Sequence, residues 1–429
     1  MDFSMMHPAD QIVTIMERIY KYGMTTTSGG NLSVKDSEGV VWISPASVDK
    51  GTLQRDDIMK IMPDGTIVGR HKPSSEYPFH LATYRQRPDL KAVLHAHPPS
   101  LVAFSIARKI PDTTLLPNAR QVCGDIAMAP YALPGSQKLG ENISEEFAKG
   151  INTVMLENHG VVIGAENLFK AFTIFETLDY CARLQINANS LGTPHSLTQK
   201  QYALYLQKHH PEMDEFIPAR RSSEELDIRI EMCSLIKRAY DNELFTSGQG
   251  TFSRRLSDGS FIITPYAKDR KYLEPGDLVR IEGNKKEFGK MPSRSLRLHE
   301  EIYKMHDDIN SVIIAHPPHI MAFAVTDARF NARLIPESYI MLRDIQKLPF
   351  GCSYLQPKET AEKISSKTPV VIIENDCVVA AGKSLLNAFD RLEVLEYSAK
   401  SVIDVKNIGG IVNISDDEVK EIETAFNLN

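Results

Sequence analysis

An internal repeat constrains this chain more than any other feature, because a series of short motifs occurs twice in the same order. The offset is 219 residues both from Pro73 to Pro292 and from His97 to His316. It stays nearly constant over the other matched motifs. A near-constant offset across several motifs indicates two copies of one domain.

The length of the chain agrees with this division. Its 429 residues are too many for one ordinary hydrophobic core. The repeat predicts a first domain over residues 1–200 and a second over 222–429. Residues 201–221 between them are polar and proline-containing, and are expected to form a linker.

Each copy has the pattern of an α/β fold. Amphipathic spacing predicts a helix over 8–22, and a second, longer helix is expected over 166–191. Short alternating runs predict strands around 31–34, 40–44 and 58–61. Strands outnumber helices and hairpin signals are common. We therefore expect two tandem domains, each a mixed or mostly antiparallel β-sheet flanked by helices.

Composition and charge exclude several classes of protein. Hydrophobic residues make up 42% and charged residues 24%, as in globular proteins. A net charge of −6 without long basic runs argues against nucleic-acid binding. No apolar run reaches the roughly 18 residues that a membrane span needs. Five scattered cysteines are typical of a reduced, cytoplasmic protein.

Two histidines two residues apart, His95 and His97, lie in an apolar run that is typical of a buried strand. Side chains at i and i+2 leave the same face of a strand, so both imidazoles can reach one ion. His159, in a second interrupted strand, is the candidate third ligand for an open zinc site. The alternative is that each histidine is a satisfied core residue.

The first copy contains Ser-Gly-Gly-Asn, Ile-Ser-Pro, Pro-Ser-Ser-Glu, His-Ala-His-Pro and Asn-His-Gly in that order. In these motifs the chain resembles the class II aldolase/adducin family. The resemblance implies a divalent metal, usually Zn²⁺ but also Mn²⁺ or Co²⁺, held by His95, His97 and His159. It also implies that Glu76 is the fourth ligand of the resting site and the catalytic acid/base.

The same resemblance implies a site for the substrate phosphate. In the family, loop serines, glycines, an asparagine and backbone amides bind this group, and they correspond here to Gly30, Asn31, Ser47, Ser74 and Ser75. The usual Thr-Gly of one loop is replaced by Ala-Ser, so one expected hydroxyl is missing. The alternative is that these residues only form turns and helix caps.

The second copy has lost the metal ligands. At the four ligand positions it has Ser295, Ile314, His316 and Asp376. One imidazole and one carboxylate do not make a zinc centre, so this copy is expected to be non-catalytic. His299 repeats His80 although the surrounding site has decayed, which favours a packing role for both.

Three function classes follow from these observations. The first is a metal-dependent aldolase that cleaves a ketose phosphate into dihydroxyacetone phosphate and an aldehyde. The second is a sugar-phosphate epimerase, dehydratase or decarboxylase that uses the same metal. The third is a non-catalytic scaffold like adducin. Glu76, where family epimerases have aspartate, favours the lyase, and the intact ligand set argues against the scaffold.

The resemblance also implies an oligomer whose active sites borrow a tyrosine from a neighbouring subunit. That tyrosine is absent from the first copy but present in the second as Tyr339. The pattern predicts a homodimer that forms a four-domain pseudo-tetramer, with Tyr339 completing the catalytic site. The alternative is that Tyr339 only packs in an interface.

Overall fold

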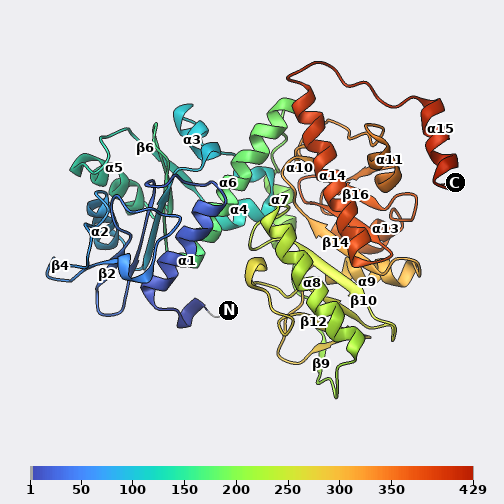
Figure 1. The fold of residues 1–429 in the computed structure, drawn as a ribbon, viewed down its shortest axis with the longest axis horizontal. Helices are drawn as coiled ribbons and strands as arrows, with labels where there is room; N and C mark the ends of the chain where they lie inside the picture. Colours follow the sequence, from blue (N-terminus) through green and yellow to red (C-terminus); the bar gives the residue numbers. More distant parts are fainter. Residues whose placement is uncertain (1–2, 429) are drawn as a thin grey trace. The chain divides into compact units, whose positions relative to one another are not determined.

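The computed structural model describes residues 3–428, and their contacts divide the chain into two units. The first unit comprises Met1–Thr114 and Asn118–Arg183, and the second comprises Leu115–Pro117 and Leu184–Asn429. Figure 1 shows the helices and strands of both and labels some of them. No helix in the described part of the chain is long and apolar enough to cross a membrane.

The first unit is built on an eight-stranded sheet in the order β4-β3-β2-β1-β5-β8-β7-β6. All neighbours are antiparallel except β6 and β7, which are parallel. The expected mixed, mostly antiparallel sheet is therefore confirmed. The strands are β1 (Asn31–Lys35), β2 (Val41–Ile43), β3 (Met59–Ile61), β4 (Ile67–Val68), β5 (Ala92–Ala96), β6 (Ile126–Ala129), β7 (Thr153–Leu156) and β8 (Val161–Ala165).

Helices cover both faces of this sheet, because its central strands are apolar on both sides. Leu94 of β5 belongs to the core that contains α1 and α6, whereas Val93 belongs to the core that contains α2 and α5. The helix expected over 8–22 is confirmed, and the one expected from 166 begins at 168. The helices are α1 (Pro8–Lys21), α2 (Tyr77–Gln86), α3 (Pro99–Ile106), α4 (Pro117–Cys123), α5 (Gln137–Ala148) and α6 (Leu168–Leu191), with 3-10 turns at Phe3–Met5, Arg55–Asp57 and Thr113–Leu115.

The second unit repeats this strand order and adds one edge strand from the linker. Its nine-stranded sheet runs β15-β16-β17-β14-β10-β11-β12-β13-β9, and β9 pairs in parallel with β13. The strands are β9 (Asp214–Phe216), β10 (Thr251–Arg255), β11 (Phe261–Ile263), β12 (Val279–Glu282), β13 (Lys285–Glu287), β14 (Ser311–Ala315), β15 (Gln346–Leu348), β16 (Val370–Ile373) and β17 (Cys377–Gly382).

The linker contributes a helix as well as β9, so more of it is ordered than a polar linker requires. This helix, α7, is short and is capped by Thr198. The helices of the second unit are α7 (Gln199–Leu206), α8 (Ser223–Asp241), α9 (Leu296–Met305), α10 (Ile320–Ala324), α11 (Pro336–Leu342), α12 (Cys352–Leu355), α13 (Pro357–Ala361), α14 (Leu385–Val405) and α15 (Asp416–Ala425), with a 3-10 turn at Arg270–Tyr272.

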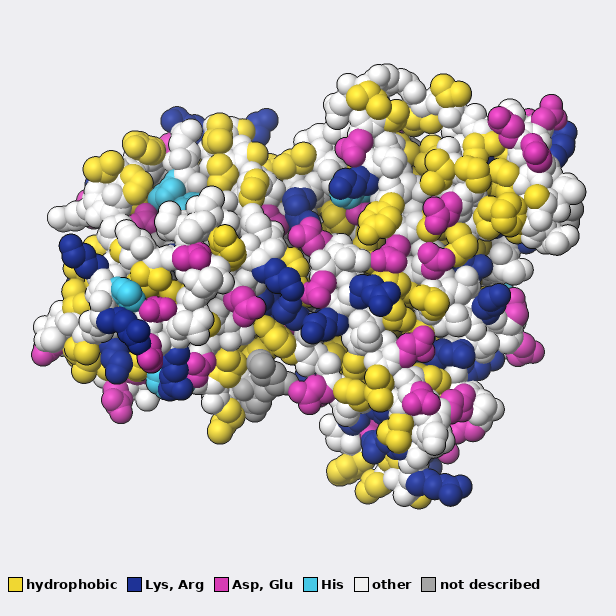
Figure 2. Space-filling model, viewed as in Figure 1, with side chains coloured by type: hydrophobic (Ala, Val, Ile, Leu, Met, Phe, Trp, Pro, Cys, Tyr) yellow, Lys and Arg dark blue, Asp and Glu magenta, His cyan; other side chains and the backbone are white. Residues whose placement is uncertain are grey.

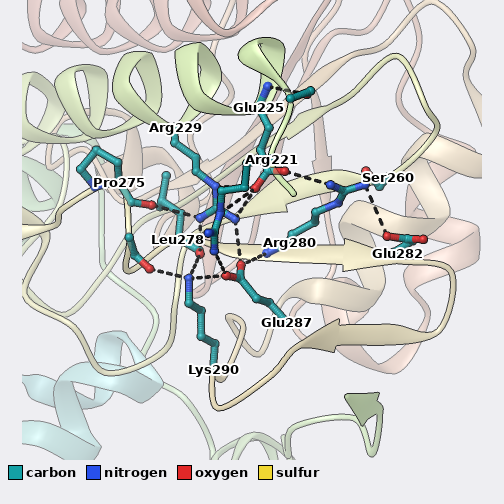
Figure 3. A network of polar contacts seen from close by, with 12 residues as sticks. Arg221, Glu225, Arg229, Ser260, Pro275, Leu278, Arg280, Glu282, Glu287 and Lys290 are labelled. Carbon is teal, nitrogen blue, oxygen red and sulfur yellow. Dashed lines mark hydrogen bonds and ion pairs between the residues drawn. The ribbon is translucent and has the colours of Figure 1, made fainter. Parts of the chain in front are cut away.

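A buried ion-pair network joins α8 to the sheet of the second unit (Figure 3). Arg229, 1% exposed, forms ion pairs with Glu225 at 2.7 Å and with Glu287 at 2.8 Å. Its guanidinium also donates to the carbonyl of Leu278 at 2.6 Å. The carboxylate of Glu287 receives a further ion pair, at 2.9 Å, from Lys290. These bonds satisfy charges that burial would otherwise make costly.

We predict that Glu287→Gln destabilises the second unit by about 3 kcal/mol, because the buried guanidinium of Arg229 loses one of its two partner charges and keeps only Glu225. Burial alone would raise the pKa of Glu287, but hydrogen bonds from Lys290 and Arg229 lower it to about 2. A lowered pKa means that the stabilisation is present above the unfolded value, near 4.3, and is lost as the pH falls toward 2. The wild type should therefore lose more stability than the variant over that range.

The measurement is native-state hydrogen exchange of the β12 and β13 amides at increasing urea concentration. Glu282→Gln is the matched control, since Glu282 lies on β12, the strand paired with the β13 of Glu287, but its side chain is 58% exposed. Equal stability of the Glu287 and Glu282 variants at neutral pH would contradict the prediction.

Candidate metal centre

Three histidines of the first unit converge at the ends of its central strands. His95 lies in β5, His97 follows β5 by one residue, and His159 lies in the turn between β7 and β8. The ring nitrogens Nε2 of His95 and His97 are 2.9 Å apart. One ligand atom from each histidine lies within 4.8 Å of the others, and within residues 3–428 this is the one such metal-ligand group found.

The strand expectation is correct for His95 but not for His97 or His159. The strand ends at Ala96, and His159 is in a turn next to Asn158, whose φ is +54°. The i, i+2 spacing still brings the two rings of the pair together, because the chain stays extended through His97 into Pro98. The turn supplies the third ring, as loops between strands commonly do at functional sites.

Two glycines let the backbone approach the histidines closely. Gly30 has a φ of +71°, and a Cβ there would lie 2.9 Å from the carbonyl oxygen of His95. A Cβ on Gly160 would lie 2.6 Å from the carbonyl oxygen of Ala96 and 2.7 Å from the ring of His97. Side chains at either position would displace the ligand strand or the imidazole.

Glu76 reaches the same point from the N-terminus of α2. Its Oε2 is 3.3 Å from Nε2 of His95, and its Oε1 is 3.8 Å from Nε2 of His159. The side chain is buried, and Oε1 has no hydrogen-bond partner among the described residues. A buried carboxylate oxygen without a donor is costly, so a cation between Glu76 and the histidines fits this arrangement.

Electrostatics favour the ligand forms of these side chains. Burial, together with the charges of neighbouring histidines, lowers the pKa of His97 to about 3 and that of His159 to about 4. Burial raises the pKa of Glu76, but the charge and hydrogen bond of His95 outweigh it and hold this pKa far below the usual range. Neutral imidazoles and an ionised carboxylate are the forms that bind zinc.

A chain of hydrogen bonds holds the carboxylate of Glu76 in place. The amide nitrogen of Asn31 donates to Oε2 of Glu76 at 2.8 Å, and the amide oxygen of Asn31 pairs with Nε2 of His80 at 2.5 Å. Nδ1 of His80 pairs with the hydroxyl of Ser33, which in turn contacts Tyr84. His95 is oriented separately, through Nδ1 and the carbonyl of Val161 at 2.9 Å. Such partners fix which ring nitrogen faces the metal.

The role of His80 was missed from the sequence, because the repeat suggested packing alone. In the second copy His299 keeps the corresponding bond to Ser253, but its Nε2 has no partner among the described residues. The residue that aligns with Asn31 is Thr251, which cannot bridge to a carboxylate in the same way. The joint loss of the asparagine and the glutamate was the available signal.

Three of the candidate phosphate residues, Ser47, Ser74 and Ser75, lie on two segments joined by a β-bridge between Pro45 and Pro73. Ser74 is buried, and its hydroxyl accepts from the amide of Glu76 at 3.3 Å. Ser75 and Ser47 are exposed, and Ser47 has a φ of +54°. Neither Ser74 nor Ser75 is the N-cap residue of α2, which begins at Tyr77 after Glu76. Gly30 and Asn31 lie at the start of β1.

A buried lysine, Lys50, supports the loop that contains Ser47. It is 1% exposed, and its ammonium donates to the carbonyl of Pro45 while its own amide donates to Thr27. Burial lowers the pKa of Lys50 to about 8. Nothing in the local sequence pattern distinguished this lysine from a surface residue.

Tyr339 lies in the second unit, on α11. Its side chain is 8% exposed, and its hydroxyl donates to Glu423 of α15 at 2.7 Å. The four positions aligned with the metal ligands hold Ser295, Ile314, His316 and Asp376, as the sequence gives them.

The two mixed α/β units share one strand order, so the protein is a duplication. The first unit brings together three buried or half-buried histidines and a carboxylate, which form one candidate metal centre. The family model for the Class II Aldolase and Adducin N-terminal domain matches residues 10–186 and 230–403. The chain therefore belongs to this family and contains its domain twice.

Several relatives carry enzyme names. A 5-deoxy-D-ribulose 1-phosphate aldolase of Bacillus thuringiensis is 32% identical over 200 residues, which are 45% of this chain and 90% of that protein. A 3-oxo-tetronate 4-phosphate decarboxylase of Haemophilus influenzae is 32% identical over 177 residues, 40% of this chain and 84% of that protein. A solved L-fuculose 1-phosphate aldolase is 31% identical with a TM-score of 0.42, covering 47% of this chain and 95% of its own.

We predict that the purified chain binds close to one divalent ion, and that His159→Ala abolishes this binding because one of three imidazole ligands is lost. The measurement is metal content by mass spectrometry after gel filtration. His71→Ala is the matched control, since His71 also lies in the first unit but pairs with Asp57 instead. Full metal content in His159→Ala would show that the ligand assignment is wrong.

Proposed function

We propose that the first copy is a metal-dependent aldolase that cleaves a ketose phosphate into dihydroxyacetone phosphate and an aldehyde. The observation that carries this proposal is the convergence of His95, His97 and His159 on Glu76, whose Oε1 is buried without a donor. Zn²⁺ is the proposed ion, with Mn²⁺ or Co²⁺ as alternatives, because three imidazoles and a carboxylate suit a borderline-soft divalent metal.

The residues of this chain divide the work of the reaction. When bound, the metal supplies Lewis-acid stabilisation of the negative charge left by carbon–carbon cleavage. Glu76 takes the proton from the substrate hydroxyl and returns it to the carbon that the broken bond leaves. Asn31, held by His80, keeps that carboxylate in place. Burial at the strand ends excludes water from the proton-transfer step.

The substrate phosphate is assigned to Gly30, Asn31, Ser47, Ser74 and Ser75. The bridge between Pro45 and Pro73 supports this assignment, because it places the two serine segments side by side next to Glu76. Backbone amides in such loops bind anions well. Lys50 stabilises the loop that contains Ser47 by donating a hydrogen bond to the carbonyl of Pro45.

A second candidate chemistry is decarboxylation, epimerisation or dehydration of a sugar phosphate at the same metal. The relative named as a 3-oxo-tetronate 4-phosphate decarboxylase favours keeping this alternative. An adducin-like scaffold has less support, because a scaffold has no need of the intact ligand set. Residues 1–200 form the proposed catalytic domain and 222–429 the non-catalytic one, with 201–221 as linker, in a cytoplasmic homodimer.

Charge on the surface is consistent with a small-molecule substrate. Lys and Arg side chains are interspersed with Asp and Glu over the face seen in Figure 2. That face offers no broad basic area for a nucleic acid.

The proposed reaction predicts that Glu76→Gln keeps the fold and much of the metal but loses at least about 100-fold in kcat, because the amide cannot accept the proton. The measurement is a retro-aldol assay of the zinc-loaded protein on a panel of ketose 1-phosphates, with aldehyde release as the readout. Glu157→Gln is the control, since Glu157 pairs with the amide of Tyr131 outside the ligand set. Unchanged turnover in Glu76→Gln would remove the acid/base role. Ketose 1-phosphates have no carboxylate to lose, so a phosphorylated 3-oxo sugar acid is added to the panel, and carbon dioxide release from it in place of aldehyde release would identify the decarboxylase.

Tyr339 is proposed to complete the active site of a partner chain. Tyr339→Phe should then lower kcat strongly with no change in the dimer, because only the hydroxyl is removed. Within its own chain this hydroxyl donates to Glu423, so Glu423→Ala is the control that breaks the bond and keeps the hydroxyl. If Tyr339→Phe retains full turnover, Tyr339 only packs in an interface and the second copy is purely structural.

A further inference from the structure

The second unit contains the degenerate counterpart of the metal centre, here called the remnant site. It consists of the residues that align with Ala46, Ser75, His97 and His159, namely Tyr266, Arg294, His316 and Asp376. The backbone at these positions keeps the form of the first copy. Ala267 has a φ of +55° where Ser47 has +54°, and Asn375 has +50° where Asn158 has +54°.

Arg294 of the remnant site binds the end of the linker helix α7. Its Nη2 donates to the hydroxyl of Tyr205 at 3.0 Å, and its Nη1 lies 3.5 Å from the carbonyl oxygen of Lys208. The guanidinium also lies 5.5 Å from the ring centre of Tyr205 and 5.4 Å from that of Tyr266. Arginine combines planar hydrogen bonding with cation–π contact, so this is a well-suited clamp for one tyrosine.

The segment Tyr205–His210 is held at its two ends, while Leu206, Gln207 and His209 are exposed. Tyr205 is 4% exposed, and its ring meets that of Tyr354 edge-on at 6.5 Å. The ring of His210 meets that of Tyr266 at 4.4 Å. Beyond the segment, β9 pairs in parallel with β13, so the following residues are anchored as well.

The side chain of Lys208 packs against Tyr354, the residue after Ser353, which binds Asp376 of the remnant site. Its ammonium lies 5.0 Å from the ring centre of Tyr354. Burial lowers the pKa of His316 to about 4, Asp376 acts to raise it, and Lys208 acts to lower it, so both charges lie within electrostatic reach of this imidazole. Asp376 is buried and also accepts from the hydroxyl of Ser353 at 2.6 Å. A buried carboxylate without a nearby cation is costly.

We propose that the remnant site is a binding site for the segment Tyr205–His210 of its own chain, which occupies it in place of metal and substrate. Lys208 supplies the positive charge for Asp376, and Arg294 and Tyr266 hold the segment where the first copy has small loop residues. In the second copy, the position of the metal and substrate site is thus a binding site for the segment Tyr205–His210. This inference does not depend on which reaction the first copy catalyses.

Arg294→Ser tests the clamp, because serine is the residue at the aligned position of the first copy. In the full-length chain, hydrogen exchange of the Lys208 amide, which donates to the carbonyl of Tyr205, should accelerate at least about tenfold. Arg297→Ser is the matched control, since Arg297 lies three residues further along, in α9, but its side chain is 46% exposed and pairs with Glu300. Equal exchange rates in the two variants would overturn the proposal.

Lys208→Met tests the charge while keeping the apolar stem of the side chain. The pKa of His316, followed by NMR titration, should rise because Asp376 then acts without an opposing cation. Lys200→Met on α7, where the lysine is exposed, is the control and should leave that pKa unchanged. If the pKa of His316 is unchanged in Lys208→Met, the ammonium of Lys208 does not occupy the remnant site. Unchanged far-UV circular dichroism reports in every variant that the chain is folded.

Discussion

The pairing of β5 with its two neighbours is the interaction on which the candidate centre depends. On one side β1 is antiparallel to β5 and places Asn31 opposite His95, and on the other β8 places Val162 opposite His95. The first pairing delivers the asparagine that holds Glu76, and the second delivers the turn that carries His159. Groups more than 60 residues apart in sequence meet because a sheet fixes register strictly when its faces are buried.

The two copies share a backbone fold but differ in the side chains at the candidate site. The sheet order is the same in both units, and even the left-handed turn residues recur. The second copy has nevertheless exchanged an imidazole for an isoleucine and a serine for an arginine. Activity in this fold is therefore decided by a few side chains at the strand ends, while the sheet beneath them is kept for packing.

Much of the fold and of the candidate site could be predicted from the sequence. The features that could not be predicted share one cause. The duplication, the sheet type and the three histidines follow from spacing, because i, i+2 geometry and repeat offsets are local properties. The features missed from the sequence are the roles of His80, Lys50 and Arg294. Their roles depend on partners 20 or more residues away, or on burial that only the folded chain creates. The one short-range contact among them is the bond of Lys50 to Pro45. The polar linker was expected from its composition, but the burial of its Tyr205 depends on contacts that only the folded chain creates.

The hydrogen-bonded Ser253, His299 and Tyr303 of the second copy have an evolutionary reading. The histidine outlasted the carboxylate that its counterpart supports, because it fills space in the interior and any replacement would leave a hole or a clash. Three of the four residues at the metal-ligand positions differ between the copies, as expected if only the first copy has kept the proposed catalysis. A decayed duplicate thus acts as a natural mutagenesis record, which separates the residues of an active site that are held by function alone from those that the core also requires.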